Sequence, residues 1–221
     1  MSILISDYIE RFSLTLPGYM NKMPWEITEN LTNIIEQLLS GSADPSHGTS
    51  PRFGMTEGAF GMTEGYTIEK GVAIHESAVI EQNVVLKPPL LIGPNVTIGA
   101  NAYLRGPVLL DAKVHIGAGC EIKQSVIFMG TAVAHFNYIG NSIIGGDVNF
   151  EAGSVAANHY NERDDKIISV KVGGKITNTG IVKFGSLVGD RSRIGANAVL
   201  SPGTVLGKGS VVARLELVQQ T

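Results

Sequence analysis

Aliphatic side chains recur at every sixth position through the middle and the end of this chain. The period has no miss from residue 68 to residue 122, and it resumes from residue 182 to residue 212. An α-helix has 3.6 residues per turn and a half-buried strand alternates, so neither predicts a six-residue period over this length. The positions in phase are Ile68, Ile74, Ile80, Leu86, Ile92, Ile98, Leu104, Leu110, Ile116 and Ile122, followed by Val182, Val188, Ile194, Leu200, Leu206 and Val212.

Three such hexads form an 18-residue coil with three short flat sides and one inward aliphatic residue on each side. Successive coils then stack at the strand spacing of a sheet, about 4.8 Å. Glycine and asparagine near the ends of the hexads suit the sharp corners, as in IGPN at 92–95 and IGAN at 194–197. We therefore predict a mainly β protein, a parallel β-helix of triangular coils over residues 68–215, with a short tail at 216–221.

The six-residue phase is lost between residues 124 and 181. This stretch keeps fragments of the repeat and also contains a polar excursion, Asn158–Lys166. Repeat proteins place insertions in loops on one face, often the binding face. We expect a loop near 158–170 that leaves a corner of the β-helix.

The first 40 residues have a different pattern, which predicts a small α-helical segment. Pro24 suits the first turn of a helix, and an apolar stripe follows it before Gly41: Ile27, Leu31, Ile34, Ile35 and Leu38. We expect this segment to cover the first coil or a neighbouring subunit. Residues 41–67 are rich in Gly, Ser and Pro and contain FGMTEG twice, which indicates a linker or loop.

Composition narrows the classes of partner and compartment. The net charge is −3 and only 17% of residues are charged, so no broad basic surface for nucleic acid is expected. The single cysteine, Cys120, excludes an intrachain disulfide. No apolar run approaches the roughly 20 residues of a membrane span, and the first residues lack the basic start of a signal peptide. We expect a cytoplasmic protein without a membrane partner.

Three basic residues follow inward positions at intervals of 18: Lys87, Arg105 and Lys123. In an 18-residue coil they stand above one another at one corner, where like charges repel. The pattern indicates an anionic ligand such as a phosphate. The alternative is that Lys87 extends into water while carboxylates neutralise the other two.

His135 lies at the phase break, three residues before Tyr138. Histidine is the usual general base near neutral pH, although a lone histidine is more often structural. Polar residues of the same irregular stretch could converge with it on a pocket, or serve as turn residues: Asn149, Asn158, His159 and Tyr160.

The stretch from Arg105 to Lys166 contains AYLRG, EIKQS, AHFNYIGNSIIGGDVNFEAGS and AANHYNERDDK. In these motifs it resembles the acetyltransferase domain of the bifunctional N-acetylglucosamine-1-phosphate uridyltransferase/glucosamine-1-phosphate acetyltransferase family. The resemblance implies a left-handed β-helix, a homotrimer and acetyl-CoA as co-substrate. General crossover rules alone would have favoured the opposite hand.

The resemblance also implies roles for single residues. His135 matches the general base, and Arg105 and Lys123 match the residues that bind phosphate. Tyr138, Asn149 and Asn158 match residues that position the amino sugar, and the backbone of Ala152 matches a contact of acetyl-CoA. The candidate substrate-binding set is completed by His159, Tyr160 and Lys166.

The chain departs from the family in three places. The family's Asn-Tyr pair reads Asn158-His159-Tyr160, so either His159 or Tyr160 takes the tyrosine's place. Nothing in residues 1–67 resembles the uridyltransferase domain. Because Thr221 follows soon after the last hexad, we expect the family's C-terminal arm to be missing or much reduced.

Two functions follow from these residues, and a third is disfavoured. The first is an acyl-CoA-dependent N-acetyltransferase acting on a phosphorylated or nucleotide-linked amino sugar. The alternative is a non-catalytic relative that binds a sugar phosphate or nucleotide. A zinc enzyme is disfavoured because the five histidines lack ligand-like spacing, so no bound metal is predicted: His47, His75, His115, His135 and His159.

Overall fold

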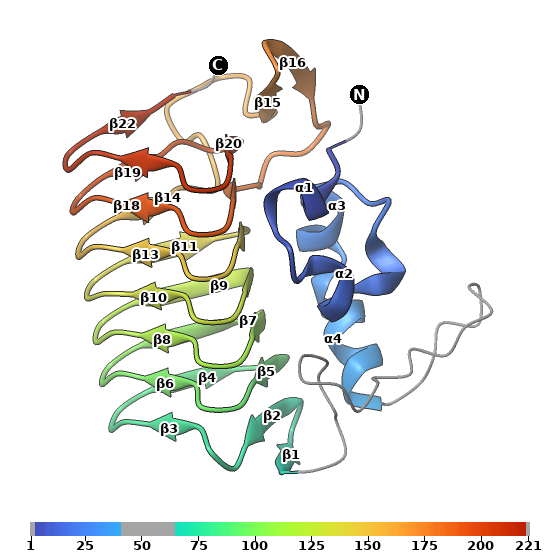
Figure 1. The fold of residues 1–221 in the computed structure, drawn as a ribbon, viewed down its shortest axis with the longest axis vertical. Helices are drawn as coiled ribbons and strands as arrows, with labels where there is room; N and C mark the ends of the chain where they lie inside the picture. Colours follow the sequence, from blue (N-terminus) through green and yellow to red (C-terminus); the bar gives the residue numbers. More distant parts are fainter. Residues whose placement is uncertain (1–2, 41–64, 220–221) are drawn as a thin grey trace.

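The computed structural model describes residues 3–40 and 65–219. It is a stack of triangular coils with a group of short helices along one side (Figure 1). Strands of successive coils pair in parallel, so the predicted fold class, a mainly β hexapeptide β-helix with an α-helical N-terminal segment, is confirmed. Of the helices that the structure describes, none is long and apolar enough to cross a membrane.

Each coil contributes a short strand to each of three sides. Side one contains β2 (Val72–His75), β5 (Leu90–Ile92), the second halves of β7 (Tyr103–Leu110) and β9 (Glu121–Ile127), β12 (Ile143–Ile144), β17 (Ser186–Val188) and β20 (Thr204–Leu206). Side two contains β3 (Val79–Ile80), β6 (Thr97–Ile98), β8 (His115–Ile116), β10 (Ala132–Val133), β13 (Asn149–Phe150), β18 (Arg193–Ile194) and β21 (Val211–Val212). Side three contains β4 (Val85–Lys87), the first halves of β7 and β9, β11 (Tyr138–Gly140), β14 (Val155–Ala156), β19 (Val199–Leu200) and β22 (Leu217–Val218).

The inward residues of the period form the core of the stack. Ile92, Ile98 and Leu104 are fully buried, as are their equivalents in the coils above. Two positions in phase are not inward residues. Ile68 lies in β1 (Tyr66–Glu69), which pairs antiparallel with β2, and is 48% exposed. Val182 lies outside the coils and is 47% exposed. The period does not report strand direction, so residues that flank a coil can match it by chance.

The loss of phase has two structural causes. The first is a coil that is one residue shorter: Arg105 pairs with Lys123 but Val108 pairs with Ser125, and Tyr138 then pairs with Glu121, 17 residues earlier. The second is an excursion between Val155 and its partner Val199.

The excursion leaves the coil at Asn158 and returns at Phe184, whose amide donates to the Asn158 carbonyl at 3.1 Å. It is longer than the predicted 158–170 and includes an antiparallel hairpin, β15 (Ser169–Val172) and β16 (Lys175–Asn178). Figure 1 shows this hairpin near the C-terminal end of the stack, on the same side as the helices.

The N-terminal helices cover the whole of side one rather than the first coil. They are α1 (Ile5–Tyr8), α2 (Phe12–Thr15), the 3-10 helix η1 (Pro17–Tyr19), α3 (Pro24–Glu29) and α4 (Leu31–Ser40). Side one carries an outward aliphatic residue in each successive coil, and all are buried beneath the helices and the excursion: Leu91, Leu109, Val126, Ile143, Leu187 and Val205. A side that is apolar on both faces needs such a cover. Most of the predicted linker, with the FGMTEG copies up to residue 64, lies outside the described residues.

Polar contacts attach the helical segment to the edge of side one. Asp190 donates its amide to the Tyr8 carbonyl at 2.9 Å and accepts the Glu10 amide on its carboxylate at 2.8 Å. Glu10 in turn lies 2.9 Å from Arg191 and 3.2 Å from Lys208. The attachment therefore combines backbone hydrogen bonds with an exposed charge triad.

Acidification should weaken this charge triad. Hydrogen bonds and charge from Arg191 and Lys208 lower the pKa of Glu10 from 4.5 to about 2. A lowered pKa means that the stabilisation is present above pH 4.5 and is lost as the pH falls towards 2. Because the groups are exposed, the contribution should be small and screened by salt.

Glu10→Gln should lower the urea midpoint at pH 7 in low salt, and the difference from the wild type should shrink in high salt and at pH 2. Fluorescence of Trp25, the only tryptophan, reports the unfolding. Glu36→Gln, at an exposed carboxylate of α4, is the control. Identical midpoints for Glu10→Gln and wild type in low salt would contradict a stabilising triad.

Candidate functional site

The predicted alignment of basic residues is present on side three. Lys87 pairs with Arg105 on the neighbouring strand, and Arg105 pairs with Lys123 on the next. All three lie where side three turns into side one, a corner that we call corner three. Lys87 is exposed, whereas Arg105 and Lys123 are half-buried.

A carboxylate compensates only part of this positive charge. Arg105 donates to the Glu121 carboxylate at 2.6 Å, and this hydrogen bond raises the pKa of the Arg105 guanidinium. Lys123 has no carboxylate within ion-pair distance among the described residues. Burial lowers the pKa of Lys123, and the nearby charges of Lys183 and Arg105 lower it further, against an opposing effect of Glu121. An anion placed here would relieve the repulsion between these cations.

Two of the predicted sugar-positioning residues lie directly above Lys123. Lys123 pairs with Gly140, and a Cβ at Gly140 would lie 2.5 Å from the Tyr138 hydroxyl and 2.9 Å from the Asn158 side chain. Glycine at this position therefore leaves room for both side chains. The Tyr138 hydroxyl is hydrogen-bonded to Asn158, and burial raises its pKa.

We call Arg105, Glu121, Lys123, Tyr138 and Asn158 the corner-three cluster. It joins basic groups with amide and phenol groups on one half-buried surface. Such a set can bind an anion and hydrogen-bond a polar ligand beside it.

His135 lies at the opposite edge of side three, where side two turns into side three (corner two). The carbonyl of His135 accepts from the Gly153 amide at 2.9 Å, so Ala152 lies one coil above it, and its side chain is exposed. His135 precedes Gly140 by five residues, which limits the separation along the coil to about 17 Å. Side three therefore has the candidate base at one edge and the cations at the other.

The neighbour of His135 has an unusual backbone. Phe136 adopts a φ of +56° and is 75% exposed. Equivalent corner-two positions in other coils are held by residues that tolerate this conformation, such as Asn101, Gly119 and Gly153.

The remaining predicted residues are dispersed. Asn149 is exposed on side two, away from the corner-three cluster of the same chain. His159 and Lys166 are exposed on the excursion. Tyr160 is buried and donates its hydroxyl to the Pro202 carbonyl at 3.0 Å, so it packs the excursion instead of facing a ligand. Of the two candidates for the family's tyrosine position, only His159 is on the surface.

Two residues of this region were not predicted. Glu121 could have been found, because it is 16 residues after Arg105 and lies on the diagonal of an 18-residue register. Lys183 had no such signal, since the excursion that precedes it breaks the register.

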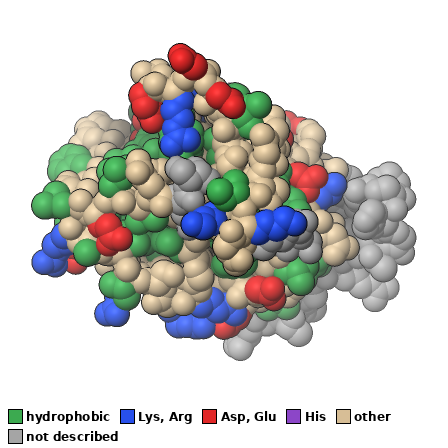
Figure 2. All heavy atoms as spheres, turned by 90° about the horizontal axis from the view of Figure 1, so that it is seen from above, with side chains coloured by type: hydrophobic (Ala, Val, Ile, Leu, Met, Phe, Trp, Pro, Cys, Tyr) green, Lys and Arg blue, Asp and Glu red, His purple; other side chains and the backbone are tan. Residues whose placement is uncertain are grey.

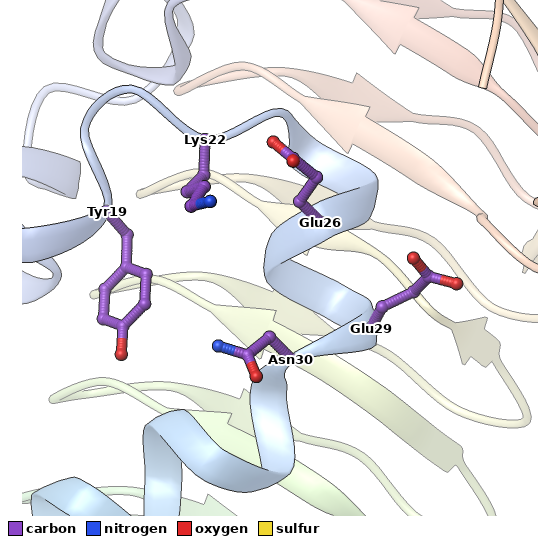
Figure 3. Close-up of a pocket in the computed structure, with 5 residues that line it drawn as sticks. All are labelled: Tyr19, Lys22, Glu26, Glu29 and Asn30. Atoms are coloured by element: carbon purple, nitrogen blue, oxygen red, sulfur yellow. The ribbon is translucent and has the colours of Figure 1, made fainter. Parts of the chain in front are cut away.

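A shallow hollow elsewhere contains none of the predicted site residues. It lies on the helical segment and is lined by Tyr19, Lys22, Glu26, Glu29 and Asn30 (Figure 3). Charge at the C-terminal end of the stack is mixed: Figure 2 shows Lys and Arg interspersed with Asp and Glu. The corner-three cluster is thus a local feature of a surface without one dominant sign.

The coils and the cluster on side three define a hexapeptide-repeat β-helix protein with a polar, basic site. Residues 88–159 match the family described as the GMPPB C-terminal domain, and residues 187–213 match the hexapeptide repeat of succinyl-transferase. The chain is also similar to bifunctional enzymes whose names combine two activities, which confirms the resemblance found in its sequence motifs.

Two such relatives show the extent of the similarity. The bifunctional sugar-1-phosphate nucleotidylyltransferase/acetyltransferase of Sulfurisphaera tokodaii is 39% identical over 140 residues, covering 63% of this chain and 34% of that protein. The bifunctional protein GlmU of Methanococcus vannielii is 28% identical over 211 residues, covering 95% of this chain and 46% of that protein. This chain therefore spans a third to a half of the length of these relatives.

A solved hexapeptide transferase family protein from Anaplasma phagocytophilum is 22% identical with a TM-score of 0.40, covering 67% of this chain and 74% of its own. A likeness of this size carries no argument about function.

Proposed function

We propose that the chain is an acyl-CoA-dependent N-acetyltransferase that acts on a phosphorylated or nucleotide-linked amino sugar such as glucosamine-1-phosphate. The observation that carries the proposal is Lys123 beside Arg105, without a carboxylate of its own among the described residues, at one edge of side three. The names of the two relatives include acetyltransferase or belong to a bifunctional protein, in keeping with this class.

Arg105 and Lys123 would hold the phosphate. Charge-assisted hydrogen bonds from guanidinium and ammonium groups to phosphate are among the stronger polar contacts in proteins. Tyr138 and Asn158, hydrogen-bonded to each other beside Lys123, would orient the sugar hydroxyls. The long basic side chains allow the phosphate to lie over side three, so that the amine can face His135.

His135 would act as the general base. It accepts a proton from the ammonium group of the sugar, and the neutral nitrogen then attacks the thioester carbonyl carbon of acetyl-CoA. A C–N bond forms, the C–S bond breaks, and the coenzyme thiolate leaves and takes up a proton. No covalent intermediate on the protein is needed. The backbone at Ala152, one coil above His135, would contact the acetyl end of the co-substrate.

The active form would be a homotrimer. Asn149 lies on side two, so it can reach a ligand on side three only from a neighbouring copy of the chain. Three copies packed around an axis would bring a side two next to each side three.

A thiol-release assay tests the proposal. Full-length protein with acetyl-CoA should release coenzyme thiol when glucosamine-1-phosphate is added, and far less with unphosphorylated glucosamine. UDP-linked amino sugar distinguishes a monophosphate from a nucleotide substrate. Calorimetric binding of the sugar phosphate without any heat from acetyl-CoA, and without turnover, would favour the non-catalytic alternative.

Lys123→Ala should raise the KM for the phosphorylated sugar roughly 10- to 100-fold with a smaller change in kcat, because a lost charge-assisted contact is worth about 1.5–3 kcal/mol. Lys171→Ala, at an exposed lysine of β15, is the matched control and should behave as wild type. Steady-state kinetics with the phosphate-free sugar should show little difference between the two variants. An unchanged KM in Lys123→Ala would remove Lys123 from the binding site.

A further inference from the structure

The excursion returns to the β-helix directly above the corner-three cluster. Asn141 donates its amide to the Lys123 carbonyl at 2.9 Å, and Gly185 donates its amide to the Asn141 carbonyl at 2.9 Å. The returning chain is therefore stacked in register over Lys123. Lys183 is the last exposed residue before this point.

The return point is held firmly. Phe184 is fully buried and packs edge-on against Trp25 of α3, with ring centroids 6.0 Å apart. A Cβ at Gly185 would collide with the Gly140 carbonyl, so the two backbones are in close contact. These contacts fix the backbone on the C-terminal side of Lys183.

The helical segment also contacts the other side of the cluster. Gln124, next to Lys123, donates its side-chain amide to the Thr28 carbonyl of α3 at 3.0 Å. The same helix therefore supports both Lys123 and the return point of Lys183. Lys183 is in this respect unlike the lysines of the hairpin, which lie on the exposed part of the excursion.

The charges near corner three then call for a dianion. Arg105, Lys123 and Lys183 carry three positive charges, and Glu121 supplies one negative charge in its ion pair with Arg105. Among the described residues, no carboxylate lies within ion-pair distance of Lys183. A phosphate monoester carries about −1.5 to −2 at pH 7 and matches this excess.

Resting on the function proposed above, we infer that Lys183 is a third anion-binding residue of the site, which contacts the phosphate of the amino-sugar substrate and is positioned by the packing of Phe184 on Trp25. The excursion would then complete the phosphate site, and α3 would act on substrate binding through Phe184 without touching the substrate.

Binding measured without acetyl-CoA tests this inference separately from catalysis. Calorimetry of the full-length protein with glucosamine-1-phosphate should show a dissociation constant at least about 10-fold weaker for Lys183→Gln than for wild type. Lys183→Arg should restore most of the affinity, and Lys171→Gln and Lys175→Gln should leave it unchanged. A UDP-linked amino sugar and inorganic phosphate, titrated in parallel, show whether a diphosphate or the phosphate group alone is the preferred anion.

The outcomes separate the two proposals. If wild type binds the phosphorylated sugar and Lys183→Gln binds it equally well, the role of Lys183 is wrong while the proposed function stands. If wild type binds neither phosphorylated sugar, the proposed function itself fails. For the positioning role, Trp25→Phe should weaken binding in a Lys183 background but have no further effect in Lys183→Gln. Equal effects in both backgrounds would assign Trp25 a purely structural role.

Discussion

Replacement of His135 by Ala should lower the rate of acetyl transfer by about 100-fold or more, because a positioned general base contributes roughly 10²- to 10⁴-fold. The fold should not change, since the contacts of this residue use its backbone. Its carbonyl accepts from Gly153 at 2.9 Å and from the Asn137 side chain at 3.2 Å, and its imidazole is exposed. Thiol release measured at saturating substrate checks the rate, and thermal unfolding checks the fold.

His159→Ala is the matched control, because His159 is also an exposed histidine close to the site in sequence. It should retain most of the activity. The residual activity of His135→Ala should rise with pH as the sugar amine deprotonates without help. Full activity in His135→Ala, or a larger loss in His159→Ala, would show that the base has been misassigned.

Phe128→Ala should lower the free energy of unfolding by about 3–5 kcal/mol, the usual cost of removing a buried aromatic side chain. Phe128 is fully buried in the layer between the helices and side one, and its ring centroid lies 6.2 Å from that of Phe12. The cavity would lie where the two parts of the fold meet. Urea unfolding followed by Trp25 fluorescence measures the loss.

Phe136→Ala makes the same chemical change at a site that is 75% exposed. It should change the free energy of unfolding by no more than about 0.5 kcal/mol. The comparison of the two variants isolates the effect of burial. Similar losses in both would show that the cover of side one contributes little to stability.

The stack of coils could be predicted because its period is a property of the chain itself. Register arithmetic then placed Arg105 next to Lys123 with no further information, and the pairing of their strands confirms it. The same arithmetic misplaced Ile68 and Val182, because the spacing of aliphatic residues does not reveal whether a segment runs parallel to the coil beside it.

The position of the helices was predicted wrongly although a signal was available. Side-one strands are apolar at consecutive positions, as in Leu90–Ile92, whereas side-two and side-three strands alternate. Consecutive apolar residues indicate a strand that is buried on both faces. This pattern predicts a cover along one side of the stack. The excursion gave no comparable signal, because the burial of Tyr160 and the place of Lys183 depend on packing against other segments.

The excursion begins and ends at one point, where the Phe184 amide meets the Asn158 carbonyl. Residues between these two positions are therefore exempt from the length rule that binds every other coil. Insertions and deletions there would leave the stack in register, so this segment can diverge as an interchangeable module while the scaffold is conserved. Grafting excursions of different length onto this one frame offers a direct route to acetyltransferases with altered choice of sugar.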